Sequence, residues 1–106
     1  MNNEIIYKEI SYNGRVIHRL NYANGEMAFV QENRITSSPE NSTAIQFWMY
    51  DVDKKELWVR YQNSTTYYVY AGVPFVTVFA MLSADSLGAF VAKEIKPNFG
   101  MSSYGL

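Results

Sequence analysis

The side chains best suited to binding chemistry lie at alternate positions of two short apolar stretches. Trp58 and Arg60 alternate along residues 56–61, so they face the same side of a strand, and Tyr67 lies in the following stretch at 66–71. Aromatic rings stack on bases, and a guanidinium binds phosphate oxygens. This combination favours a stacking platform for a nucleotide or a single-stranded nucleic acid. The alternative is an arginine that lies along a tryptophan ring within the folded protein.

A second group of basic residues lies in the N-terminal part of the chain. Arg15 and Arg19 lie close to His18, the single histidine, and could bind phosphate groups. We prefer the alternative that these charges protect a hairpin edge from pairing with another chain. A lone histidine in a chain without cysteine lacks the repeated ligand spacing of a metal site. We therefore expect no metal and no cofactor.

The sequence contains no pattern that predicts catalysis. Asp51 and Asp53 form a carboxylate pair, but they precede two lysines in a polar turn, which favours a solvated loop. No serine has a positioned base near it in the sequence, and there is no glycine-rich phosphate loop. We expect no catalytic residues and interpret the chain as a non-enzymatic binding protein.

The elements that must position these residues are mainly strands. Asn13-Gly14 and Asn24-Gly25 are strong hairpin signals, because a type I′ turn needs positive φ at both central positions. They separate stretches typical of strands at 5–12, 15–22 and 27–31. A polar loop at 33–42 follows, and then further strands at 45–50, 56–61 and 66–71.

The C-terminal part of the chain indicates helices. Pro74 suits the first position of a helix, Ser86 can cap a second short helix, and residues 100–106 read as a flexible tail. The predicted fold is α+β: an antiparallel meander of about six strands, followed by two short C-terminal helices, in a single domain over 1–106. Large apolar residues at strand or helix period are usually core. We expect that role for Leu57, Val59, Tyr68, Tyr70, Phe79, Leu82 and Phe90.

A series of short motifs in the second half resembles the KTSC domain family. The motifs are Asn41-Ser42-Thr43, Tyr50-Asp51, Glu56-Leu57, Tyr68-Val69-Tyr70, Gly72-Val73-Pro74, Ala84, Ser86-x-Gly88, Phe90 and Ile95. This module is named for the C-terminal region of some lysyl-tRNA synthetases and also occurs as a free-standing bacterial or phage protein. The resemblance covers 42–99 and leaves 1–34 as an N-terminal β-hairpin extension.

The resemblance implies three strands followed by helices and no established activity, although an RNA-binding role has been suggested for such modules. The chain departs from the family pattern at Ser42-Thr43, at Asn63-Ser64 and at its basic end. There, Ile95-Lys96-Pro97-Asn98 replaces a more cationic sequence, which weakens the nucleic-acid interpretation.

Composition limits the classes of partner. The formal net charge is −1, whereas non-specific duplex binders are usually basic. The N-terminus has no signal-peptide pattern, and the longest apolar stretch is too short to cross a bilayer, so we expect a cytoplasmic protein without membrane contact.

Two hypotheses remain open for function. The first is a binder of a nucleotide or single-stranded nucleic acid through Trp58, Arg60 and nearby tyrosines. The second is a protein-interaction module with a host partner, such as a phage-encoded inhibitor of a bacterial defence system. Both faces of the central strands are apolar, so one face needs the N-terminal hairpins, a ligand or another subunit to cover it. We therefore expect a homo-oligomer, a two-fold dimer.

Overall fold

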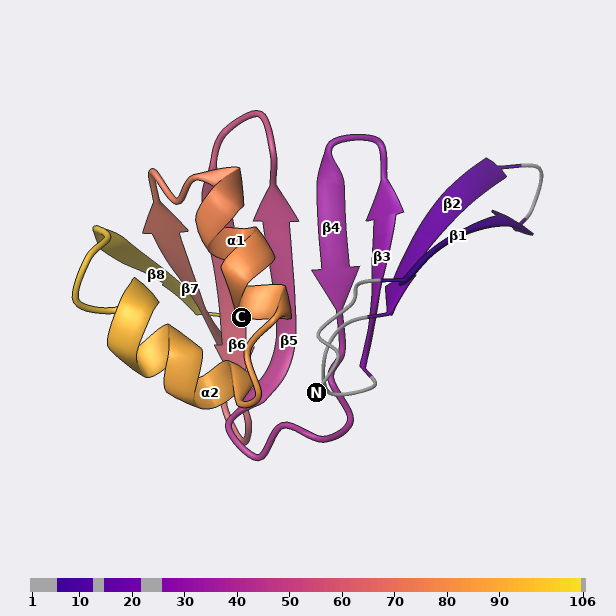
Figure 1. Ribbon diagram of the computed structural model, residues 1–106. Coiled ribbons are helices and arrows are strands. Elements are labelled where there is room, and N and C mark those ends of the chain that lie inside the picture. The colour runs from indigo at the N-terminus through magenta and orange to yellow at the C-terminus, as the bar shows by residue number, and fades with distance from the viewer. Residues whose placement is uncertain (1–5, 13–14, 22–25, 106) are drawn as a thin grey trace.

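One antiparallel sheet contains all the strands of the residues that the computed structural model describes, which are 6–12, 15–21 and 26–105 (Figure 1). Its eight strands follow the order of the chain from β1 at one edge to β8 at the other. They are β1 (Ile6–Tyr12), β2 (Arg15–Asn21), β3 (Met27–Gln31), β4 (Arg34–Ser37), β5 (Ile45–Asp51), β6 (Glu56–Tyr61), β7 (Thr66–Ala71) and β8 (Met101–Gly105).

The helices follow β7 and lie on one side of the sheet, in front of β5 to β7 in Figure 1. They are α1 (Phe75–Leu82), α2 (Leu87–Phe90) and the π-helical segment η1 (Val91–Ile95), which continues α2 without a break. Ser86 caps α2, since its hydroxyl accepts a hydrogen bond from the Ala89 amide at 3.2 Å. The prediction of an α+β fold, with an antiparallel sheet and two short C-terminal helices, is confirmed.

A buried tyrosine fixes the connection from β7 to α1. The Tyr50 hydroxyl donates a hydrogen bond to the Val73 carbonyl at 2.6 Å, and the Val73 amide donates to the Lys55 carbonyl at 2.9 Å. Gly72 adopts a φ of +76°, which an L side chain would strain. Pro74 is the N-cap residue, so α1 begins one residue later than predicted.

Two strands lie where the sequence predicts none. β4 falls inside the predicted loop at 33–42, and β8 corrects the prediction of a flexible tail at 100–106. Both pair over their full length with strands of the second half, β4 with β5 and β8 with β7. These distant partners stabilise two segments whose local sequence is polar.

A hydrogen-bond cluster joins the N-terminal hairpins to the rest of the sheet. The Asn33 side chain, in the β3–β4 turn, donates to Asp51 at 3.2 Å and to Asp53 at 3.0 Å. Asp51 also accepts the backbone amides of Asp53 and Lys54 at 3.1 and 3.0 Å. The carboxylate pair therefore holds two turns in place, as side-chain acceptors in turns commonly do.

The core lies between the sheet and the helices. Leu57, Val59, Tyr70 and Leu82 are at most 1% exposed, while Tyr68 and Phe90 are half-buried against this cluster. The core prediction for Phe79 is wrong, because its side chain is 50% exposed. α1 turns Val78, Met81 and Leu82 toward the sheet instead. With an apolar residue at nearly every position of α1, periodicity does not select the buried face.

Two core tyrosines share a hydrogen bond. The hydroxyls of Tyr61 and Tyr70 lie 3.0 Å apart, and the Tyr61 ring meets the Tyr68 ring edge-on with centroids at 5.4 Å. Burial raises the pKa of Tyr61 above its usual value, and the hydrogen bond with Tyr70 raises it further. Burial likewise raises the pKa of Tyr50, with a contribution from the charge of Asp51. Both side chains therefore stay protonated well beyond neutral pH.

We expect Gly88→Ala to destabilise the fold. A Cβ at Gly88 would lie 2.8 Å from the Ala44 Cβ, so α2 would have to shift from the start of β5. Overpacking of this kind costs about 1–3 kcal/mol. Gly100→Ala is the matched control, because nothing lies within 4 Å of a Cβ at that position. Urea unfolding of both variants measures the difference; equal midpoints would contradict this packing.

We also expect stability to fall in alkaline solution. A group whose pKa is raised by folding contributes stability that is complete below its unfolded pKa, about 10 for tyrosine, and is lost as the pH rises above it. Tyr61→Phe should lessen the loss measured by urea unfolding between about pH 8 and pH 11. Tyr104→Phe, at an exposed position, is the control and should lose as much stability over this pH range as the parent protein does. An unchanged alkaline slope in Tyr61→Phe would contradict the assignment.

Candidate binding face

The side of the sheet that faces away from the helices carries a continuous set of large side chains. Alternation along each strand places them opposite the core, and the strand register aligns Phe29, Thr36, Met49, Trp58 and Val69 across five strands. We call this side of β3 to β8 the open face. No helix of the described residues covers it (Figure 1).

A β-bulge explains why β5 carries apolar side chains on both of its sides. The β5–β6 register shifts between Ile45 and Phe47, so Ile45 and Trp48 both enter the core although they are three residues apart. Phe47 and Met49 consequently lie on the open face. The N-terminal strands do not cover this face, because they pair edge to edge and extend the sheet sideways.

Four aromatic side chains on the open face form a connected group, which we call the aromatic cluster: Phe47, Trp58, Tyr67 and Tyr104. The Trp58 and Tyr104 rings stack, with centroids 5.5 Å apart and an angle of 15° between their planes. Tyr67 meets both Trp58 and Phe47 edge-on, each at 6.2 Å. The cluster therefore connects β5, β6, β7 and β8.

Tyr104 is the most exposed ring of this cluster, at 53%, whereas Trp58 is half-buried. Trp58 was predicted as the stacking platform, but one of its ring faces is already occupied by Tyr104. Val69, which belongs to the same face, is only 5% exposed. Tyr104 lies in the segment predicted to be a flexible tail, whereas in the structure it pairs with Tyr67 in β8 and so joins the cluster.

Arg60 is held beside the aromatic cluster by two neutral groups. Its Nε donates a hydrogen bond to the Gln46 side chain at 3.0 Å, and its guanidinium carbon lies 5.6 Å from the Tyr67 ring centroid. Neither partner carries a charge that would neutralise the guanidinium. Arg60 therefore keeps donors and a positive charge for an anionic group near Tyr67.

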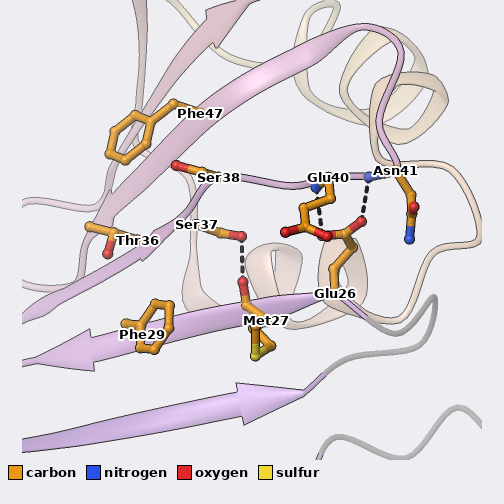
Figure 2. A pocket seen from close by; sticks show the side chains of 9 residues that line it. All are labelled: Glu26, Met27, Phe29, Thr36, Ser37, Ser38, Glu40, Asn41 and Phe47. Carbon is orange, nitrogen blue, oxygen red and sulfur yellow. Dashed lines mark hydrogen bonds between the residues drawn. The ribbon is translucent and has the colours of Figure 1, made fainter.

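Two hollows adjoin the aromatic cluster on the β3–β5 part of the open face. Figure 2 shows the first, of about 290 Å³, with Phe29 and Phe47 on one side and the Glu26 carboxylate on the other. Glu26 is 5% exposed and accepts the backbone amides of Glu40 and Asn41 at 2.8 and 2.5 Å (Figure 2). The second, of about 550 Å³, is lined by residues that include Arg34, Thr36 and Met49.

The other predicted basic residues lie away from this cluster. Arg19 pairs with Phe29 and lies four strands from Trp58, which is about 19 Å at the usual strand spacing. Arg15 pairs with Tyr12 at the far end of the β1–β2 hairpin. The structure thus brings Trp58, Arg60 and Tyr67 together but separates them from Arg15 and Arg19.

No group of side chains with metal-binding spacing occurs among the residues that the structure describes. Within the same residues, no helix is long and apolar enough to cross a membrane.

Comparison with known proteins adds a family assignment. A family model for the KTSC domain matches residues 41–99, which is more than half of the chain. No curated protein and no solved structure matches the chain. The matched region contains β5 to β7 and the helices, so β1 to β4 and β8 lie outside it. Tyr104 also lies outside the matched residues.

Proposed function

This chain belongs to the KTSC domain family, and we propose that it binds single-stranded nucleic acid through the open face of its sheet. The observation that carries the proposal is the exposed Tyr104 ring stacked on Trp58, with the Arg60 guanidinium over the adjoining Tyr67 ring. Stacking surfaces next to a cation are the usual means by which proteins hold unpaired bases.

The arrangement of the rings favours binding because it is already ordered. Trp58 stacks on one face of Tyr104, so a base that stacks on the other face of Tyr104 would continue an existing stack. Little side-chain freedom is lost on binding when a ring is held in this way. Each such base contact is worth about 1–3 kcal/mol in single-strand binders.

The extent of the aromatic cluster favours a strand over a single nucleotide. Its rings come from four adjacent strands, which span about 14 Å at the usual strand spacing. The two hollows continue this surface over β3 and β4, with Phe29 and Thr36 lining both. A surface of this length accommodates several consecutive nucleotides.

The open face carries few positive charges, so we expect base stacking, rather than phosphate contacts, to supply most of the affinity for nucleic acid. Among the described residues of β3 to β8, the basic side chains on the open face are Arg60 and Arg34. Two acidic residues, Glu26 and Glu40, line the first hollow. With two phosphate contacts, the slope of log K against log salt for a single strand is only about −1.4. A strongly basic duplex binder would give a much steeper slope.

A comparison of two equally exposed aromatic residues tests the proposal. Tyr104→Ala should weaken binding to labelled oligouridylate or oligothymidylate of about 10 nucleotides by about 5- to 150-fold in fluorescence anisotropy. Tyr104→Phe, which keeps the ring, should bind nearly as tightly as the parent. Phe79→Ala is the control, because Phe79 is 50% exposed on α1, on the other side of the sheet.

Arg60→Gln adds a second readout, since removing one phosphate contact should reduce the salt slope by about 0.7. Lys55→Gln in the β5–β6 turn should leave the slope unchanged. Failure of every oligonucleotide to bind the parent protein, or equal affinity of Tyr104→Ala and Phe79→Ala, would reject the proposal.

A second candidate function for the open face is association with another copy of the chain. Met27 and Phe29 are 39% and 37% exposed on β3, beside the first hollow, and such apolar side chains favour a protein contact. A two-fold dimer buries the same patch on both copies. Light scattering over a wide concentration range should then give a dimer mass, which Phe29→Lys should reduce to that of the monomer. A monomer mass at every concentration would rule out this candidate.

A further inference from the structure

A further hollow of binding size lies on the helix side of the sheet, separate from the two hollows of the open face. It has a volume of about 420 Å³, within the range typical of small-molecule pockets. We call it the tyrosine pocket. Its lining comes from β6, β7, the start of β8 and the residue that follows η1: Tyr61, Tyr68, Tyr70, Lys96 and Met101.

The hydroxyl groups of the tyrosine pocket have a hydrogen to donate. The hydroxyls of Tyr61 and Tyr70 lie 3.0 Å apart, and only one of their two hydrogens can lie between the oxygens. The hydroxyl that accepts this bond keeps its own hydrogen for another acceptor. Because burial raises the pKa of Tyr61, its hydroxyl remains protonated at neutral pH. Tyr68 adds a third hydroxyl to the lining.

Lys96 supplies a positive charge at the edge of the same pocket. The residue is exposed, and its Nζ lies 5.4 Å from the centroid of the Tyr61 ring. This cation–π contact places the ammonium group beside the Tyr61 ring, at the edge of the pocket. An ammonium group donates hydrogen bonds and cannot accept them.

The tyrosine rings and Met101 give the pocket an apolar wall. The rings of Tyr61 and Tyr68 meet edge-on, with centroids 5.4 Å apart, and Met101 is 55% exposed at the pocket rim. A methionine thioether adapts to the shape of an apolar group more readily than a branched side chain does. The pocket therefore combines hydrogen-bond donors and one cation with an apolar wall.

We propose that the tyrosine pocket binds a small organic anion, a phosphate monoester or carboxylate carried on an apolar body. The oxyanion contacts Lys96 and the hydroxyl that the Tyr61–Tyr70 pair leaves available, and the apolar body lies against Tyr68 and Met101. This site does not depend on nucleic-acid binding at the open face, because the two surfaces lie on opposite sides of β6 and β7.

A matched set of probes tests the chemistry of the ligand. Phenyl phosphate and benzoate should perturb the NMR signals of the Tyr61 and Tyr68 rings and of the Lys96 side chain in a saturable way. Inorganic phosphate should bind more weakly, because it lacks the apolar body. Benzylamine, which carries the same ring with a positive charge, should not bind. Equal binding of benzylamine and phenyl phosphate would contradict the proposal.

Two lysine variants test the position of the site. Lys96→Gln should lower the affinity for phenyl phosphate about tenfold, as expected for loss of a hydrogen bond to a charged group. Lys93→Gln, at an exposed position of η1, should leave it unchanged. Both residues are exposed, so neither change should alter the melting temperature. An unchanged affinity in Lys96→Gln, or signals that shift only on the open face, would overturn the assignment.

Discussion

The register between β5 and β6 determines which side of the sheet the large side chains of these two strands take. Side chains alternate along a strand, so a slip of one residue would exchange the core side chains of the slipped strand for its open-face side chains. A slip of β5 would turn Trp48 outward and Met49 inward, whereas a slip of β6 would turn Leu57 outward and Trp58 inward. Because β5 is apolar on both sides, hydrophobicity alone distinguishes its two registers poorly. Local hydrogen bonds must therefore fix the choice.

Two neighbouring residues at the end of β5 supply those hydrogen bonds. Tyr50 points into the core and holds the Val73 carbonyl, which places the start of α1. Asp51 points to the other side and holds the β5–β6 turn together with Asn33 of the β3–β4 turn. A buried hydroxyl and a nearly buried carboxylate are costly unless their hydrogen bonds are satisfied. A slipped register would lose both sets of bonds at once, so this pair enforces a single alignment.

Sequence reasoning succeeds where the signal is local and fails where it is not. The alternation of side chains along β6 correctly predicts that Leu57 and Val59 face the core and that Trp58 and Arg60 face the other side. This prediction needs only the sequence of the strand itself. β8 has no such signal, since residues 101–105 form a strand only through pairing with β7. The place of Tyr104 on the open face was therefore not predicted. The exposed position of Phe79 was missed because the helix is apolar on all sides.

The exposure of β8 would couple any ligand bound on the open face to the pairing of β8 with β7. All five residues of β8 are exposed, so detaching this strand breaks its ladder with β7 but uncovers little of the core. A detached β8 would carry Tyr104 away from Trp58 and leave the indole face bare. A ligand that stacks on Tyr104 would bind only the state in which β8 is paired with β7. Binding would therefore increase the population of that paired state. Slower amide exchange in β8 would accompany such binding, and Trp58 fluorescence would report the opening.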